Sequence, residues 1–363
     1  MRERLERLLA RRRDYRQEIL DLVDGAPRVV FYGCGRNQEG ILEYWNSYIG
    51  RRVDFCCDGD SRKWGRSFGG AMCLSPDELI AMKDDCVVFV TIGDFGPVFR
   101  FLEGHGFPSV HHLYKYDLAA SEFLPPREPD SVLQGLMECH GVLEDSRSRE
   151  VFSAIVERVL GDGSDLDVMH KVCEGEQYFP PGLAMMSGQE RLVDAGAFNG
   201  DTLQDFIARC AGKFDRVFCF ELDEINFKAL QANVDLMPER DRVSIYNLGL
   251  WDEAAEISYS IGKYQSAIGT GQAKGRVIAL DEALEGQRIS MIKMDIEGAE
   301  LKGLRGARNI IKDQHPKLAI CVYHDFRHLW EVPLYIKSLV PEYRIFLRHH
   351  TALEYETVCY AIP

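Results

Sequence analysis

The fold of the C-terminal half is decided by the stretch Val193-Asp194-Ala195-Gly196-Ala197-Phe198-Asn199-Gly200-Asp201-Thr202. An apolar, strand-like run leads into it and a helical pattern follows it. Gly196 permits a tight turn and Gly200 lets the backbone pass close to a ligand, because glycine has no Cβ. The helix after the turn offers free N–H groups at its start. This strand–turn–helix pattern predicts the first unit of an open α/β sheet with a ligand site at the turn.

The charge of this turn indicates which cofactor it suits. A dinucleotide site has G-x-G-x-x-G at this place and holds a pyrophosphate, whereas here Asp194 ends the strand. A carboxylate repels a pyrophosphate and attracts the ammonium and sulfonium groups of S-adenosylmethionine. Glu221 follows Gly196 by 25 residues, about where an acid accepts both ribose hydroxyls. We therefore predict an S-adenosylmethionine site. The alternative is that both acids only cap helices of an empty sheet.

A second motif lies further along the chain, at Ile292-Lys293-Met294-Asp295-Ile296-Glu297-Gly298-Ala299-Glu300. Together with the Asp194 turn, it resembles the FkbM-type family of S-adenosylmethionine-dependent methyltransferases. The hallmark of that family is a K-[IM]-D-[IV]-E-G-A-E junction downstream of a D-x-G-A-x-x-G-D-T loop. The resemblance covers roughly residues 176–363. Its last part is similar to a subfamily that carries a Rossmann-like N-terminal unit.

The resemblance implies a class I methyltransferase fold and methyl transfer to an oxygen of a sugar or natural-product scaffold. It also implies that the cofactor is lined by Asp194, Gly196, Asn199, Gly200, Thr202, Glu221 and Leu222, with Asn247 and Gly249 on the adenine side. Asp295 is expected at the end of the fourth strand, near the transferring methyl group.

Methyl transfer to a hydroxyl benefits from a general base, and the best candidates are Asp295 and His324. Both are expected at the carboxyl ends of adjacent strands, the edge at which open α/β sheets bind ligands. The alternatives are a strand-end histidine bonded to a backbone carbonyl and an aspartate that caps a helix. Glu297 and Glu300 are more typical of acids that stabilise the first turn of a helix.

Other polar residues near the strand ends receive weaker predictions. The pairs His111-His112 and His349-His350 cannot chelate one ion, because neighbours on a strand point to opposite faces. We therefore expect no metal, and leave open a divalent ion held by Asp295 with another carboxylate. Arg348 and His349 are candidate substrate contacts, with a solvated strand end as the alternative.

The apolar runs predict the fold class, an α/β protein whose C-terminal part has seven strands with helices between the first five. The candidate strands are 192–194, 217–222, 243–248, 289–295, 318–323, 343–348 and 357–361. Only a short loop separates the last two, so they are predicted to form an antiparallel hairpin. This pattern favours a class I methyltransferase sheet over a dehydrogenase.

The N-terminal part is predicted to be a helix over residues 1–24 and a smaller Rossmann-like α/β unit with four strands. The predicted domains are residues 1–118, a helical connector over 119–186, and the methyltransferase domain over 187–363. In the N-terminal unit, Gln38 replaces the third glycine of a dinucleotide fingerprint that begins at Gly33, while Asp58 could accept ribose hydroxyls. A bound nucleotide and a structural role both stay open for this unit.

Composition excludes several kinds of partner. A net charge of −14 argues against nucleic acid and against an anionic membrane surface. The eleven cysteines contain no C-x-x-C pair and are expected to be buried free thiols of a cytoplasmic protein. No apolar run is long enough to span a membrane, and the charged N-terminus does not read as a signal peptide. A homo-oligomer is left open.

The function predicted from the sequence is methyl transfer from S-adenosylmethionine to a hydroxyl oxygen of a sugar, glycan precursor or related small molecule. One alternative is an NAD-dependent oxidoreductase whose N-terminal unit holds the dinucleotide. The other is a non-catalytic module that binds a nucleotide-sugar or a glycosyltransferase. Gln38 and the acidic Asp194 turn count against the first, and the intact 194–200 loop counts against the second.

Overall fold

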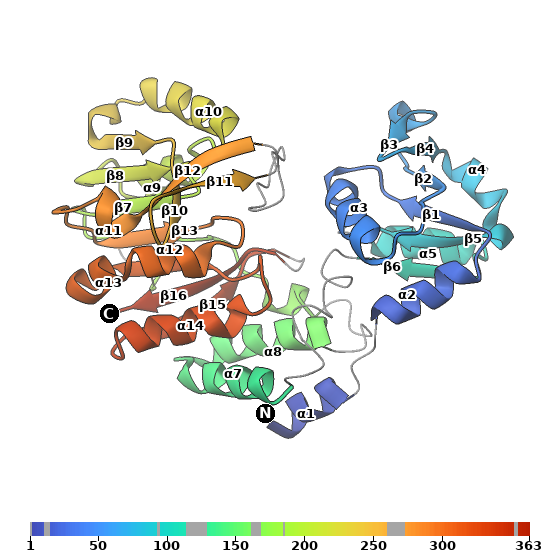
Figure 1. The fold of residues 1–363 in the computed structure, drawn as a ribbon, viewed down its shortest axis with the longest axis horizontal. Coiled ribbons are helices and arrows are strands. Elements are labelled where there is room, and N and C mark those ends of the chain that lie inside the picture. Colours follow the sequence, from blue (N-terminus) through green and yellow to red (C-terminus); the bar gives the residue numbers. More distant parts are fainter. Residues whose placement is uncertain are drawn as a thin grey trace. The chain divides into compact units, whose positions relative to one another are not determined.

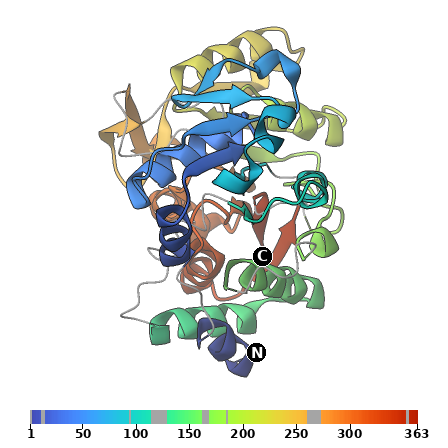
Figure 2. The same ribbon diagram turned by 90° about the vertical axis from the view of Figure 1, so that its right-hand side faces the viewer.

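The computed structural model describes residues 2–10, 15–92, 95–113, 129–160, 168–183, 186–259, 273–351 and 355–363. The chain divides into two units, of which one comprises residues 1–5, 130–158 and 163–363 and the other residues 6–129 and 159–162. Both chain ends belong to the first unit, and they are marked N and C in Figures 1 and 2. The predicted boundary between residues 118 and 119 lies outside the described residues, and the domain limits stay predictions.

The larger unit contains a seven-stranded sheet with the strand order β15-β16-β14-β13-β7-β8-β9. Its strands are β7 (Arg191–Ala195), β8 (Arg216–Phe220), β9 (Val243–Tyr246), β13 (Met291–Met294), β14 (Lys317–Cys321), β15 (Arg344–His349) and β16 (Thr357–Ile362). Strand β16 runs antiparallel to its neighbours β14 and β15, and the other strand pairs of this sheet are parallel. The predicted sheet, with seven strands and an antiparallel last hairpin, is confirmed.

The parallel strands of this sheet are buried along almost their whole length, because helices cover the sheet. The helices that follow the strands are α9 (Asp201–Arg209), α10 (Glu224–Asp235), α11 (Leu280–Ala283), α12 (Glu300–Gly306), α13 (Arg308–Gln314) and α14 (His328–Leu339). Apolar side chains of α9 and α10 pack with Leu192, Val217 and Cys219 in one core. Gly303 of α12 lies against the side chain of Met294, at the end of β13.

The segment predicted as a connector contains α7 (Pro129–Val142) and α8 (Ser146–Leu160), and both pack on the larger unit. Their corner covers the outer edge of β15. Ile345 O accepts from Glu144 N at 2.8 Å, Leu347 N donates to Ser148 Oγ at 2.9 Å, and His349 O accepts from Glu174 N at 2.7 Å. These bonds satisfy backbone groups that an open edge strand would leave exposed.

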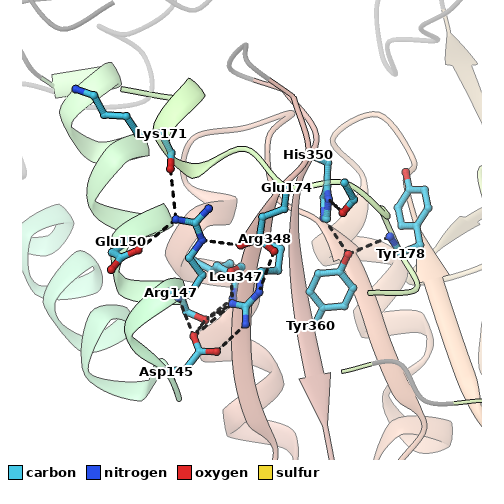
Figure 3. A network of polar contacts seen from close by, with 12 residues as sticks. Asp145, Arg147, Glu150, Lys171, Glu174, Tyr178, Leu347, Arg348, His350 and Tyr360 are labelled. Atoms are coloured by element: carbon cyan, nitrogen blue, oxygen red, sulfur yellow. Dashed lines mark hydrogen bonds and ion pairs between the residues drawn. The ribbon is translucent and has the colours of Figure 1, made fainter. Parts of the chain in front are cut away.

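An ion-pair network around the buried Arg348 strengthens this edge (Figure 3). The guanidinium of Arg348 contacts Asp145 Oδ2 at 2.6 Å, and its Nη1 donates to Ser148 Oγ at 3.0 Å. Arg147 bridges Glu174 and Glu150 beside it. Arg348 and His349 are both buried, and the ring of His349 contacts Thr357 Oγ1. The alternative of a solvated strand end is therefore wrong for these two residues, which hold the sheet edge, and their contact with a substrate stays a prediction.

A second, three-stranded sheet lies between the third and fourth strands of the main sheet in chain order. It consists of β10 (Gly249–Trp251), β12 (Ala273–Ala279) and β11 (Ala255–Tyr259), in that order. The sequence analysis did not predict it. The burial of β11 and β12 alternates between exposed and half-buried positions, so these strands lack the apolar run that identified the others.

The smaller unit is a six-stranded sheet with the order β3-β4-β2-β1-β5-β6. Its elements are α2 (Tyr15–Asp24), β1 (Arg28–Tyr32), α3 (Arg36–Tyr48), β2 (Phe55–Cys57), β3 (Ser67–Phe68), β4 (Ala71–Leu74), α4 (Pro76–Ile80), β5 (Cys86–Val90), α5 (Gly96–Gly104) and β6 (Val110–His112). The four predicted strands are present, and the predicted count is wrong because β3, of two residues, and β4, of four, were not predicted. Helix α1 (Arg2–Ala10) precedes α2, so the structure describes two helices within the predicted 1–24 segment.

Two further expectations concern the whole chain. All eleven cysteines are free, and each is buried except Cys173, which is half-buried. Among the described residues, no helix combines the length and the apolar character that crossing a membrane requires.

The edge network predicts the effect of removing its central cation. Replacing Arg348→Met should lower the free energy of unfolding by about 2–3 kcal/mol, because charged hydrogen bonds are lost and Asp145 keeps an unpaired charge. Arg344→Met, on an exposed position of the same strand, is the matched control and should change it by less than about 0.5 kcal/mol. Chemical denaturation followed by circular dichroism measures both, and equal effects would contradict the assigned role.

Candidate functional site

A buried ion pair holds the site at the ends of two central strands. Lys293 of β13 and Asp194 of β7 are direct partners in the parallel ladder. Lys293 Nζ lies 2.9 Å from Asp194 Oδ1, and the two side chains are 2% and 0% exposed. Burial alone would lower the pKa of Lys293, but the carboxylates of Asp194 and Asp295 outweigh it and raise that pKa. Asp194 is thus charge-paired inside the protein, and its predicted contact with a cofactor stays a prediction.

Lys293 also fixes the turn that follows β7. Its ammonium donates to Gly196 O at 2.7 Å. Gly196 has a φ of +74°, and a Cβ there would lie 1.8 Å from Asp295 O. Glycine is therefore required at this position by the close approach of two strand ends, in addition to the tight turn. Gly200, with a φ of +89°, ends the turn where α9 begins, and it packs against Leu230 of α10.

Glu221 lies directly after β8 and faces the same turn. Its two carboxylate oxygens accept from Phe198 N and from Asp223 N, both at 2.8 Å. Burial raises the pKa of Glu221 to about 7, against the effect of these two hydrogen bonds. Asp223 caps α10 by accepting from Ile225 N and Asn226 N. The predicted ribose acceptor and the predicted glycine turn are therefore brought together.

The other predicted cofactor residues extend this site along the strand ends. Asn247 Nδ2 donates to the carbonyl oxygens of Glu221 and Leu222, at 2.9 and 3.1 Å. A Cβ at Gly249 would lie 3.3 Å from Leu222, so these two residues pack together. Asn199 accepts from Asp201 N through its side chain, and Thr202 follows in the first turn of α9. The carboxyl ends of β7, β8 and β9 thus gather every residue predicted for the cofactor.

Asp295 lies one residue beyond β13 and is held by two tyrosines. Tyr178 donates to Asp295 Oδ2 at 2.8 Å, and Tyr323 donates to Asp295 Oδ1 at 3.1 Å. Part of the carboxylate reaches the surface, since the side chain is 22% exposed. The predicted alternative of a helix cap receives no support, because α12 begins at Glu300 with no side-chain cap.

His324 lies beside Asp295, within a group of carboxylates. Its Nδ1 is 2.9 Å from Glu300 Oε1, and its Nε2 is 3.3 Å from Glu297 Oε2 and 3.5 Å from Asp295 Oδ1. Burial would lower the pKa of His324, but Glu300 and Glu297 outweigh it and raise the pKa well above its usual value. The predicted proximity of His324 and Asp295 is therefore present, although the predicted backbone-carbonyl partner of His324 is replaced by Glu300.

Some site residues were missed by sequence reasoning. Lys293 stood in the quoted motif without a role, and Tyr178 and Tyr323 were given no role. Glu356 had no signal at all, because it lies in a loop near the C-terminus. Burial and then the nearby charge of Asp295 raise the pKa of Glu356 to about 7, and Gln177 donates to its carboxylate. These residues are far apart in the sequence, and folding brings them together at the end of β13.

The smaller unit gives its predicted nucleotide acceptor other partners. Asp58 Oδ2 accepts from Cys34 N at 2.9 Å and from Lys63 Nζ at 2.7 Å. Gln38 is buried where the third glycine of the fingerprint would stand. Asp58 is thus bonded to groups of the protein and Gln38 is buried. A nucleotide in this unit stays a prediction.

Comparison with known proteins bears on the fold class of the larger unit. The larger unit has a mainly parallel sheet with one reversed strand, β16. A glycine turn follows its first strand in the chain, and an acid follows its second. These features define a methyltransferase-like α/β fold. Residues 194–353 match the family described as the methyltransferase FkbM domain. No curated protein matches the chain.

One solved structure supports the fold over most of the chain. The methyltransferase FkbM from Methylobacillus flagellatus KT has a TM-score of 0.75 and 24% sequence identity, and the match covers 94% of this chain and 92% of that chain. It therefore extends over both units. An rRNA methylase from Streptococcus thermophilus matches with a TM-score of 0.32 and 14% identity over 54% of this chain and 92% of that one.

The ion pair beneath the turn predicts a large effect on stability. Lys293→Met should lower the free energy of unfolding by about 3–5 kcal/mol, because Asp194 then keeps a buried, unpaired charge. The double variant Lys293→Met with Asp194→Asn should recover at least half of this loss, since the orphaned charge is gone. Lys312→Met, on the surface of α13, is the control. Denaturant unfolding measures all of them, and a double variant no more stable than Lys293→Met would contradict the ion-pair account.

Proposed function

We propose that the protein transfers a methyl group from S-adenosylmethionine to a hydroxyl oxygen of a sugar, glycan precursor or related small molecule. The observation that carries this proposal is the buried carboxylate of Glu221, which faces the 196–200 turn in a chain that matches the methyltransferase FkbM domain over residues 194–353. A carboxylate at this place suits a ribose diol. The net charge of −14 favours a small-molecule acceptor over nucleic acid.

The residues present fit this cofactor. When bound, it supplies an electrophilic methyl group on a sulfonium. Glu221 and the turn from Gly196 to Thr202 would hold the ribose and the amino-acid part, and Leu222, Asn247 and Gly249 would border the adenine. Asp194 contributes through Lys293, which fixes the turn. Alignment of the reacting atoms is the main task of such a site.

Asp295 and His324 are the residues proposed to contact the acceptor hydroxyl. Asp295 is the better candidate for the general base, because its carboxylate is partly exposed and two tyrosine hydroxyls hold it in one orientation. His324 is only 5% exposed and lies beside Asp295 and Glu297, so it is the less accessible of the two candidates. A proton taken from the hydroxyl makes the oxygen a better nucleophile.

Calorimetry with S-adenosylmethionine and with NAD separates the proposal from its oxidoreductase rival. We expect micromolar-range binding of S-adenosylmethionine, at least tenfold weaker in Glu221→Ala and unchanged in Glu282→Ala on α11, and no binding of NAD. Heat from NAD alone would overturn the proposal. Incubation with methyl-labelled cofactor and cell extract then identifies the acceptor, and a chain that binds the cofactor but labels nothing would favour a non-catalytic module.

The pKa of Glu221 predicts how cofactor affinity depends on pH. With a pKa of about 7, the carboxyl is mostly neutral at low pH and mostly ionised at high pH. The ionised form is the stronger acceptor for two ribose hydroxyls. Affinity for S-adenosylmethionine should therefore rise by about tenfold between about pH 6 and pH 8. Calorimetry across this range measures it. Glu221→Gln should bind weakly with a flat profile, and a profile as steep as that of the wild type would exclude Glu221 as the titrating group.

A further inference from the structure

The end of β14 holds an imidazole nitrogen that has no hydrogen bond. The side chain of His324 is only 5% exposed, and its Nε2 is buried without a hydrogen-bond partner. Asp295 Oδ1 and Glu297 Oε2 lie 3.5 and 3.3 Å from it. Donor atoms of Asp295, Glu300 and His324 all lie within 4.8 Å of one another. Two ligands that each bind one ion at about 2.1 Å lie about 3.0–3.4 Å apart in octahedral or tetrahedral sites. The distances from Nε2 are close to that range.

Glu300 fixes the orientation of this imidazole. Its Oε1 accepts from Nδ1 of His324 and from the backbone N–H groups of Ile296 and Gly298. Its side chain is fully buried, and its Oε2 lies 3.2 Å from Nδ1 of His328. A carboxylate that accepts from one ring nitrogen leaves the other nitrogen as a metal ligand, which is the usual arrangement behind metal-binding histidines.

The charges at this place also favour a bound cation. Asp295, Glu297 and Glu300 bring three carboxylates to His324, and Lys293 is paired with Asp194. With Nδ1 committed to Glu300, either a proton or a metal ion can lie between Nε2 and the oxygens of Asp295 and Glu297. A divalent ion carries more positive charge than the proton and can take its place there.

We propose that His324, Asp295 and Glu297 bind a divalent first-row transition-metal ion, with Glu300 as the residue that orients His324. One imidazole with carboxylates suits Mn²⁺, Fe²⁺ or Zn²⁺ better than Mg²⁺, which prefers oxygen ligands alone. Asp295 and Glu297 are partly exposed, so the ion keeps positions open toward solvent. If the proposed function holds, the open position takes the acceptor hydroxyl and lowers its pKa. The open alternative of an ion at Asp295 with another carboxylate is thereby favoured over the metal-free expectation.

Paramagnetic resonance of Mn²⁺ tests this without turnover, since bound Mn²⁺ loses the signal of the free ion. The full chain is first treated with a chelator and then titrated with Mn²⁺. We expect one Mn²⁺ per chain, at least tenfold weaker binding in His324→Ala and in Glu297→Gln, and wild-type binding in Glu285→Gln. Zn²⁺ should displace the bound Mn²⁺, and Mg²⁺ in equal amount should not.

Wild-type binding that is absent, or that is unchanged in both Glu297→Gln and His324→Ala, would overturn the proposal. Glu297 is 27% exposed, so Glu297→Gln is expected to fold and decides the matter if His324→Ala does not. Calorimetry with S-adenosylmethionine on the same metal-free samples keeps the two proposals distinguishable. Loss of cofactor binding with Mn²⁺ binding intact would contradict the methyl-transfer function alone, and the reverse would contradict only the metal site.

Discussion

The site depends on one buried ion pair, between Lys293 and Asp194, at the ends of two adjacent parallel strands. Two charges inside a sheet are costly to bury, and only close pairing and further hydrogen bonds offset that cost. Here Lys293 also donates to Gly196 O, so the pair carries the start of the glycine turn with it. The turn in turn presents Phe198 N to Glu221. A disturbance at Lys293 therefore reaches Glu221 through covalent neighbours and hydrogen bonds.

The topology of the sheet explains why so many polar groups meet at one place. In parallel strands the carboxyl ends lie on one edge, and the residue after each strand faces its neighbours there. Glu221 follows β8, Asp295 follows β13, and Tyr323 lies just beyond β14. The reversed strand β16 brings the loop with Glu356 to this same edge from the other direction. In an all-parallel sheet, this edge would hold only the ends of strands and no strand start.

The sequence predicted those parts whose signal is local. Buried parallel strands read as apolar runs, so all seven strands of the main sheet and the acids at their ends were found. Strand β3 was missed because it has only two residues, and β11 and β12 because alternate positions along them are exposed, whereas β4 was not predicted although its four residues are apolar. The pairing of Lys293 with Asp194 could not be predicted, since it needs the register between strands far apart in the chain. The edge role of Arg348 was hidden for the same reason.

The motif from Lys293 to Glu300 is best understood as a set of charges with separate partners. Lys293 faces Asp194 beneath the turn, Asp295 accepts from two tyrosines, and Glu300 holds His324. Asp295 and Glu297 are partly exposed beside the imidazole. Because the three acids differ in burial and in their partners other than His324, an exchange of one for another would not preserve the site. The similarity of these residues in the sequence thus conceals distinct tasks: accepting from two tyrosines, orienting a histidine, and facing the space in which a ligand can enter.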